Sequence, residues 1–141
     1  MQPDDEKTLC EGKSFLFCTD DPTKAREALV KLLFGEEVDY DGKASTWLAP
    51  DDCLLWMVSF DGVIRKGWKN YFVSDEELYQ ENVFHKWIRP KDLHLTRAVF
   101  SATTHGSQTD LVFKGLYVYE EEKSDLGGKM YFRKVASEYG F

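Results

Sequence analysis

Tryptophan rings, cationic side chains and an asparagine are concentrated in the middle of this 141-residue chain. The mixture suits a flat, hydrogen-bonding ligand, because rings stack on a base, an amide bonds its edge and cations hold phosphate. It therefore predicts a binding site for a nucleic-acid base or a nucleotide. The candidate ligand-binding residues are Trp47, Arg65, Lys66, Trp68, Lys69, Asn70 and Tyr71.

The spacing of these residues limits how many of them can share one pocket. Side chains alternate between the two faces of a strand, so Trp68 and Asn70 would point to one face and Lys69 and Tyr71 to the other. A bulge would be needed to bring all the rings together. Trp56 and Trp68 also suit a β-rich core, and the sequence leaves burial and ligand binding open as alternatives for them.

The sequence contains no recognisable set of catalytic residues. Cys53 begins an apolar run, where a free cysteine behaves as a small hydrophobic residue rather than as a nucleophile. His105 stands alone in a loop, and acidic residues occur in runs such as Glu120-Glu121-Glu122, which are typical of exposed turns. We therefore favour a binding module over an enzyme, while a small hydrolase or transferase that uses His105 stays open as an alternative.

Neither a metal ion nor a cofactor is expected. Cys10 and Cys18 are eight positions apart, and no second pair of Cys or His stands at zinc-ligand spacing. The pair Gly127-Gly128 lacks the following Lys-Ser or Lys-Thr and the helix of a phosphate-binding loop. The polar start does not follow the pattern of a secretion signal, and no run of 18 apolar residues occurs. We expect reduced thiols, no membrane segment and a cytoplasmic location.

The clearest local signal predicts a helix over residues 22–34. Asp21 can cap the helix, Pro22 fits its first position and Gly35 suits its end. Between these residues the apolar side chains recur at helical spacing and form one face, which predicts packing against the rest of the domain. The apolar positions are Ala25, Ala28, Leu29, Leu32 and Leu33.

The remaining elements are mostly strands. A short second helix over 75–81 is the exception, because Ser74 and Glu77 fit a capping box. A single domain over 1–141 is expected, with an α+β fold whose mostly antiparallel sheet curls or forms a partly open β-barrel. After a frayed polar start over 1–12, strands are predicted over 15–18, 44–48, 53–60, 63–73, 94–102, 111–119 and 129–136.

The net charge of −7 is unevenly distributed along the chain. Residues 1–62 hold 6 Lys and Arg against 14 Asp and Glu, which supports an alternative function. That alternative is a protein–protein interaction domain, an inhibitor or adaptor, whose acidic surface with Asp51 and Asp52 meets a basic protein partner. Residues 63–97 hold 7 cations against 5 acids and form either an ordinary solvated surface or the candidate face for a phosphate backbone. The cations are Arg65, Lys66, Lys69, Lys86, Arg89, Lys91 and Arg97.

Two groups of short motifs together resemble a known family. The first group is Trp47-Leu48-Ala49-Pro50, Gly67-Trp68-Lys69-Asn70 and Glu81-Asn82. The second group is Phe113-Lys114-Gly115-Leu116-Tyr117, Glu122-Lys123-Ser124 and Tyr131-Phe132-Arg133-Lys134-Val135-Ala136. Both groups resemble small PUA-like domains of the EVE/ASCH type, which in bacteria occur alone or fused to HNH-type and other restriction-associated nucleases.

The resemblance covers roughly residues 44–136 and implies a small β-barrel with flanking helices. Related domains hold RNA, or a modified or flipped DNA base, in an aromatic cleft. Carried over to matching positions, it implies that Trp47, Trp68 and Asn70 form this cleft. Arg133 occupies a motif position, for which an ion pair with the acidic loop is the structural interpretation. A nucleic acid or nucleotide is thus the expected partner.

Overall fold

The computed structural model describes residues 8–40, 45–84, 93–125 and 128–141. Within these ranges the chain forms one helix and ten strands. The helix is α1 (Pro22–Phe34). The strands are β1 (Thr8–Cys10), β2 (Ser14–Phe17), β3 (Thr46–Leu48), β4 (Leu54–Val58), β5 (Trp68–Ser74), β6 (Glu77–Asn82), β7 (Arg97–His105), β8 (Gln108–Tyr119), β9 (Lys129–Ala136) and β10 (Glu138–Gly140).

Helix α1 has the bounds that the sequence predicts. The Asp21 carboxylate accepts a hydrogen bond from the Thr23 backbone N–H at 3.0 Å, and Pro22 occupies the first turn. Ala25, Leu29 and Val30 are its buried residues. Leu32, which the periodicity assigned to the apolar face, is 62% exposed because the helix contacts the sheet through a narrower stripe.

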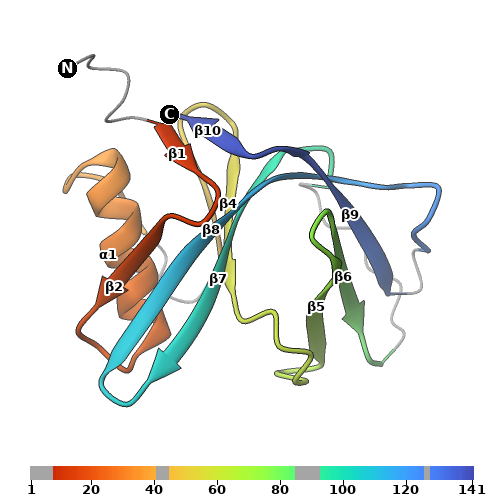
Figure 1. Ribbon diagram of the computed structural model, residues 1–141, viewed down its shortest axis with the longest axis horizontal. Helices are drawn as coiled ribbons and strands as arrows, with labels where there is room; N and C mark the ends of the chain where they lie inside the picture. Colours follow the sequence, from red (N-terminus) through yellow and green to blue (C-terminus); the bar gives the residue numbers. More distant parts are fainter. Residues whose placement is uncertain (1–7, 41–44, 85–92, 126–127) are drawn as a thin grey trace.

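Eight strands form one curled sheet, which Figure 1 shows as an arch with β8 and β9 across its top. The strand order is β3-β4-β7-β8-β9-β6-β5, and β2 also pairs with β8. The β4–β7 pair is parallel and the other pairs are antiparallel. Strands β3 and β5 stand at the two ends of this order, so the described part of the sheet is curled but not closed. The mostly antiparallel curled sheet is confirmed.

Strand β8 belongs to both sides of the arch. Its residues Thr109–Val112 pair with β2, and its residues Leu116–Tyr119 pair with β9. Between these stretches Gly115 has φ +122°, and the register shifts by one position against β7 next to Gly115 and against β9 between Leu116 and Tyr117. Such irregularities bend a strand and increase its twist. The bend at Gly115 therefore produces the arch.

The two faces of the sheet carry separate apolar clusters. On one face, Leu55, Met57, Phe100 and Phe113 pack with α1, with β1 and with β10. The other, concave face buries a second set of side chains under the arch, which comprises Trp56, Leu78, Val99, Tyr117, Met130 and Phe132. Alternating side chains of the central strands thus build both clusters.

The short helix predicted over 75–81 is wrong. Residues 77–82 form β6, which pairs with β5 on one side and with β9 on the other. The Ser74 hydroxyl accepts a hydrogen bond from the Glu76 N–H at 3.2 Å, so the residues of the capping box form a tight turn. Burial of Leu78 between two partner strands outweighs this weak local signal for a helix.

Other predicted boundaries shift by a few residues. The strand predicted over 63–73 begins only at Trp68, because residues 61–67 form a turn. The strand predicted over 94–102 runs instead over Arg97–His105. Within the predicted frayed start, β1 pairs with β10. The positions His85, Lys86, Arg89 and Lys91 lie outside the described residues.

Candidate functional site

A cavity of about 600 Å³ opens on the concave face of the sheet, between its two end strands. One side of the cavity is formed by the first turn of α1, by strand β3 and by the ends of β4 and β7. The other side is formed by β5, by β6 and by the turn before β5. The lining residues are Pro22, Thr23, Arg26, Ser45, Thr46, Trp56, Val58, Ser59, Val63, Arg65, Lys66, Trp68, Asn70, Gln80 and Arg97.

Strand β5 supplies a ring and an amide to this cavity. Trp68 and Asn70 alternate with Lys69 along the strand, so they share the concave face. The side-chain oxygen Oδ1 of Asn70 is buried and accepts no hydrogen bond from the described residues. Buried polar atoms in folded proteins nearly always have a partner. This oxygen can therefore serve as an acceptor for a donor on a bound ligand.

Strand β7 supplies a buried cation. Arg97 is only 4% exposed, and its guanidinium carbon lies 4.7 Å from the ring centroid of Trp56 and 4.6 Å from that of Phe132. Two aromatic rings thus hold the guanidinium by cation–π contacts. Because Arg97 also lines the cavity, it places a permanent positive charge beside any ligand there.

The electrostatic character of the cavity contrasts with that of the whole chain. Although the net charge is −7, the lining contains Arg26, Arg65, Lys66 and Arg97 and no described Asp or Glu. Such a cationic concavity attracts anionic or electron-rich ligands.

One carboxylate lies close to this lining. The Asp61 side chain accepts two hydrogen bonds from the Arg65 guanidinium, each at 2.8 Å. This contact lowers the pKa of Asp61 to about 2, so the ion pair is present at neutral pH. It offsets part of the positive charge of Arg65 and fixes where the guanidinium lies.

The structure brings four of the seven predicted binding residues together. Arg65, Lys66, Trp68 and Asn70 line the cavity, and Trp56 contributes its ring while being 99% buried. Trp56 is thus both a buried residue and a part of the cavity lining. Side chains alternate between the two faces of β5, as predicted for residues 68–73. This alternation explains why Trp68 and Asn70 line the cavity while Lys69 and Tyr71 do not.

The other three predicted residues lie elsewhere. The Trp47 ring packs 5.1 Å from that of Phe34 in the cluster under α1, and its Nε1 donates a hydrogen bond to the Asp39 carbonyl at 2.8 Å. Lys69 and Tyr71 are on the opposite face of β5, where the Lys69 ammonium lies 5.6 Å from the Tyr71 ring. Trp47, Lys69 and Tyr71 therefore do not line the cavity.

Sequence reasoning missed the part of the site that comes from other elements. Gln80 stands opposite Asn70 across the β5–β6 pair, and Arg26 lies in α1. Arg97 was noted only as one cation of the basic segment. A usable signal was its place at the head of the apolar run Ala98–Phe100, where a buried arginine indicates a specific role.

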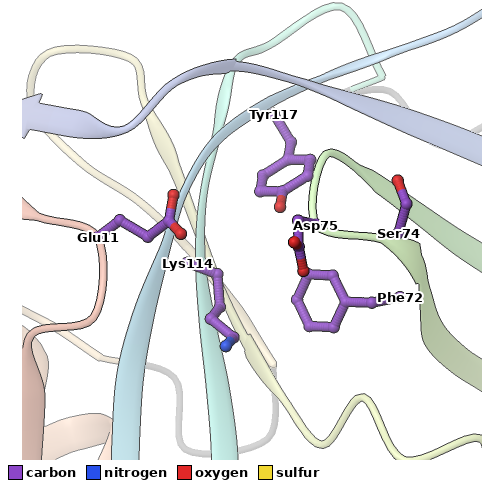
Figure 2. A pocket seen from close by; sticks show the side chains of 6 residues that line it. All are labelled: Glu11, Phe72, Ser74, Asp75, Lys114 and Tyr117. Atoms are coloured by element: carbon purple, nitrogen blue, oxygen red, sulfur yellow. The ribbon is translucent and has the colours of Figure 1, made fainter.

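A second cavity of about 260 Å³ has mixed charge (Figure 2). Its labelled side chains include Glu11, Asp75 and Lys114, with the Lys114 ammonium 5.5 Å from the Phe72 ring centroid. Burial and the nearby Asp75 and Glu76 carboxylates raise the pKa of Tyr117 to about 12, so its phenol stays protonated. The carboxylates make this cavity a poorer site for a phosphate-bearing ligand.

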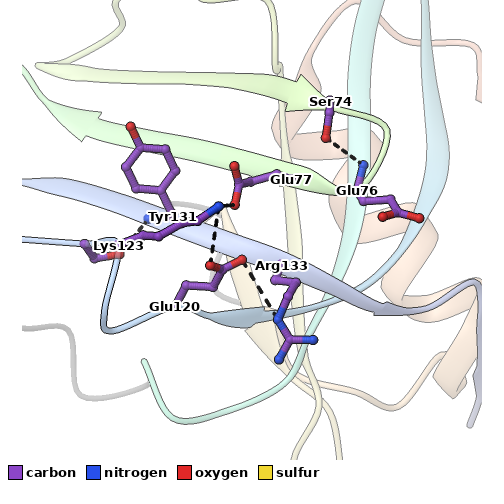
Figure 3. A network of polar contacts seen from close by, with 8 residues as sticks. Ser74, Glu76, Glu77, Glu120, Lys123, Tyr131 and Arg133 are labelled. Carbon is purple, nitrogen blue, oxygen red and sulfur yellow. Dashed lines mark hydrogen bonds and ion pairs between the residues drawn. The ribbon is translucent and has the colours of Figure 1, made fainter.

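Arg133, the motif position with no assigned chemistry, belongs to a surface network (Figure 3). Its Nε lies 3.9 Å from a Glu120 carboxylate oxygen, and Lys123 bridges Glu120 and Glu77 at 3.8 and 2.7 Å. The Tyr131 backbone N–H donates to the Ser124 hydroxyl at 2.8 Å. These contacts hold the acidic loop after β8 against β6 and β9.

The described residues also limit other kinds of site. Among them, no three His, Cys, Asp or Glu side chains are placed to hold a metal ion. Cys10 and Cys18 are exposed free thiols, whereas Cys53 is buried, and its burial raises the pKa of the thiol to about 11. His105 is exposed at the end of β7. Within the described ranges, no helix has the length and apolarity to span a membrane.

Comparisons with known proteins point to one kind of fold. No family model matches the chain, and no curated protein sequence matches it. The solved structure of the 5-hydroxymethylcytosine-specific restriction enzyme AbaSI is similar, with a TM-score of 0.65 and 17% sequence identity. The match covers 96% of this chain and 43% of the AbaSI chain. The fold of this chain is therefore similar to that of a part of AbaSI, and this part makes up less than half of the AbaSI chain.

Proposed function

We propose that this chain is a nucleic-acid-binding module that takes one base into the cavity beside Trp68 and Asn70. In this proposal the sheet is a PUA-like domain, and the cavity is the cleft in which such domains hold a base. The observation that carries the proposal is the lining itself. It combines a tryptophan ring, a buried amide oxygen that accepts no hydrogen bond from the described residues, and four cations in a lining that includes no described Asp or Glu.

The polar groups of the cavity suit the edge of a base. The Asn70 oxygen accepts from a ring or exocyclic N–H, while the Arg97 guanidinium donates to a ring nitrogen or a carbonyl. Gln80 stands opposite Asn70 in the paired strands and adds a second amide to the same lining. A neighbouring acceptor and donor match the alternating groups on the hydrogen-bonding edge of a nucleobase.

The apolar and charged parts of the lining suit the rest of a nucleotide. The Trp68 indole offers a face for stacking, which is worth about 1–3 kcal/mol per base. Arg65 and Lys66 follow one another in the turn before β5, where they can hold phosphate groups on either side of the bound base. A volume of about 600 Å³ lies within the range of about 300–1,000 Å³ that is usual for ligand sites.

The likeness of fold to a restriction enzyme that is specific for a modified cytosine supports recognition of a base in DNA. It makes 5-hydroxymethylcytosine the first base to test. Because the chain spans 43% of that enzyme, the proposal concerns binding and assigns no cleavage to this chain.

Fluorescence anisotropy of dye-labelled oligonucleotides tests the proposal. Single strands and duplexes with one central cytosine or 5-hydroxymethylcytosine are titrated at low and physiological salt with the unmodified protein, Trp68→Ala and Tyr71→Ala. The two variants each remove a ring from β5, one from each face. We expect Trp68→Ala to weaken binding at least about fivefold, as loss of one stacked base implies, and Tyr71→Ala to have little effect.

Two outcomes would count against the proposal. Absence of binding to every oligonucleotide at low salt would remove the nucleic-acid function altogether. Loss of binding in Tyr71→Ala but not in Trp68→Ala would move the site to the convex face of β5.

A further inference from the structure

The turn between β4 and β5 exposes apolar side chains at the edge of the cavity. Residues Asp61–Gly67 form this rim turn, and its members Val63, Arg65 and Lys66 line the cavity. Val63 and Ile64, in the arm of this turn before its two-residue end Lys66-Gly67, are 53% and 55% exposed. Among the large hydrophobic side chains that are exposed in the described ranges, these two alone are consecutive in sequence.

The rim turn is held in a fixed shape. Arg65 and Trp68 exchange two backbone hydrogen bonds, at 2.8 and 2.9 Å, and the Gly62 N–H donates to the Asn70 carbonyl at 2.9 Å. The Asp61 carboxylate also accepts from the Val63 N–H at 3.0 Å. The turn therefore loses little conformational freedom when it enters a binding partner.

A rigid turn with two exposed apolar side chains followed by two cations matches what duplex nucleic acid accepts from a protein. Proteins that deform a duplex insert apolar wedges between base steps, while neighbouring cations contact phosphate. A base can reach an enclosed cavity from a duplex only by leaving the stack, and its departure opens a gap. A single strand offers its bases without such a gap, so a wedge would gain nothing there.

We infer that the ligand is duplex nucleic acid and that Val63 and Ile64 enter the base stack beside the base that the cavity takes. This inference rests on the proposed function, because the gap exists only if the cavity binds a base. The wedge fills the vacated space and hinders the return of the base. Arg65 and Lys66 contact the backbone on the side of the turn that faces the cavity.

A double variant, Val63→Ser with Ile64→Ser, tests the wedge. The control is Val73→Ser, which changes a valine of the same sheet that is 49% exposed and lies on the other face of β5. Both variants are first compared with the unmodified protein by circular dichroism and thermal unfolding. Each is then titrated with three DNA probes that carry the same central 5-hydroxymethylcytosine: a matched duplex, a duplex in which that base is unpaired, and a single strand.

We expect the double variant to bind the matched duplex at least about tenfold more weakly, which corresponds to about 1.4 kcal/mol. Binding to the unpaired duplex should fall less, and binding to the single strand should fall least, because there only the contribution of Val63 to the cavity lining is lost. With 2-aminopurine next to the central base, the unmodified protein should raise the fluorescence of the matched duplex by unstacking it. The double variant should raise it less, and Val73→Ser should behave like the unmodified protein.

The outcomes separate this inference from the proposed function. If the double variant binds all three probes equally less well, or none of them less well, the wedge is wrong while base binding stands. If the unmodified protein prefers the single strand to the duplex, the ligand class is wrong. If it binds no probe at all, both the wedge and the proposed function are wrong.

Discussion

Asn70 and Gln80 stand directly opposite each other on β5 and β6, and both side chains line the same cavity. Two amides on paired strands present donors and acceptors at a fixed separation, because the hydrogen bonds of the sheet fix the backbone of both strands. Asn70 contributes an acceptor that the described residues leave unused. This pair is the most specific polar feature of the site.

Replacement of Asn70 by leucine should stabilise the protein and abolish base binding. An apolar side chain of similar size removes the cost of a buried oxygen without a partner, which we expect to add about 1 kcal/mol to the free energy of unfolding. Urea unfolding measures this change, and oligonucleotide anisotropy measures binding. A lower stability of Asn70→Leu would show that the amide is satisfied in solution.

Lys66 and Lys69 provide a test of which face of β5 meets phosphate. Lys66 lines the cavity and Lys69 lies on the opposite face. Loss of one phosphate contact changes the slope of log Kd against log salt concentration by about 0.9. We expect this change in Lys66→Gln and none in Lys69→Gln, measured by titration at several salt concentrations. Equal slopes for the two variants would contradict a phosphate contact at Lys66.

Substitution of Gly115 should destabilise the arch. A Cβ at this position would lie 2.8 Å from the Ala136 carbonyl oxygen, and φ of +122° disfavours any side chain. We expect Gly115→Ala to lower the free energy of unfolding by at least about 2 kcal/mol. The control is Gly106→Ala, where φ is +59° and nothing lies within 4 Å, and the expected loss is about 1 kcal/mol. Similar losses in the two variants would argue against the close contact.

The rim turn should loosen in acid. The folded-state pKa of Asp61 is lowered to about 2 from 3.8, so its ion pair with Arg65 stabilises the turn above about pH 4 and is lost as the pH falls toward 2. Both side chains are about half exposed, so the effect on global stability should stay below about 1 kcal/mol. NMR titration of the Asp61 carboxyl and hydrogen exchange at the Val63 N–H measure the change. A carboxyl that titrates near 3.8 would contradict the ion pair.

Local signals in the sequence predicted the elements that depend on few residues. The cap at Asp21 and the glycine after α1 define the helix, and alternation along β5 separated Trp68 and Asn70 from their neighbours. The same type of signal failed at Ser74 and Glu77, where a capping box occurs in a turn between strands. Residues 77–82 form a strand there because they pair with β9, which lies far along the chain.

Only part of the site could be predicted, for a similar reason. Arg97 acquires its role from Trp56 and Phe132, which lie on other strands, and no local pattern brings these three side chains together. Trp47 matched the resemblance, yet its indole N–H bonds the Asp39 carbonyl in the cluster under α1. A sequence pattern identifies residue types, whereas the topology of the sheet decides which of them share a cavity.

The acidic surface that supported the alternative function contains a structural residue. The Asp51 carboxylate accepts hydrogen bonds from the Tyr139 hydroxyl at 2.9 Å and from the Cys53 N–H at 3.0 Å. Charge reversal at Asp51 would therefore disturb the fold, whereas the side chain of Asp52, which is also exposed, makes no hydrogen bond to the described residues. A test for a basic protein partner should change Asp52 alone.

The pairing of β1 with β10 has a practical consequence for single-molecule work. In Figure 1 these strands lie at the top of the molecule, and the segment between β4 and β5, which includes the rim turn, lies at the bottom. The exposed thiol of Cys10 in β1 is therefore a natural anchor point once Cys18, also exposed, is replaced by serine. A molecule attached to a surface through Cys10 would present its cavity to the solution, so that passing nucleic acid could be observed without a tag near the site.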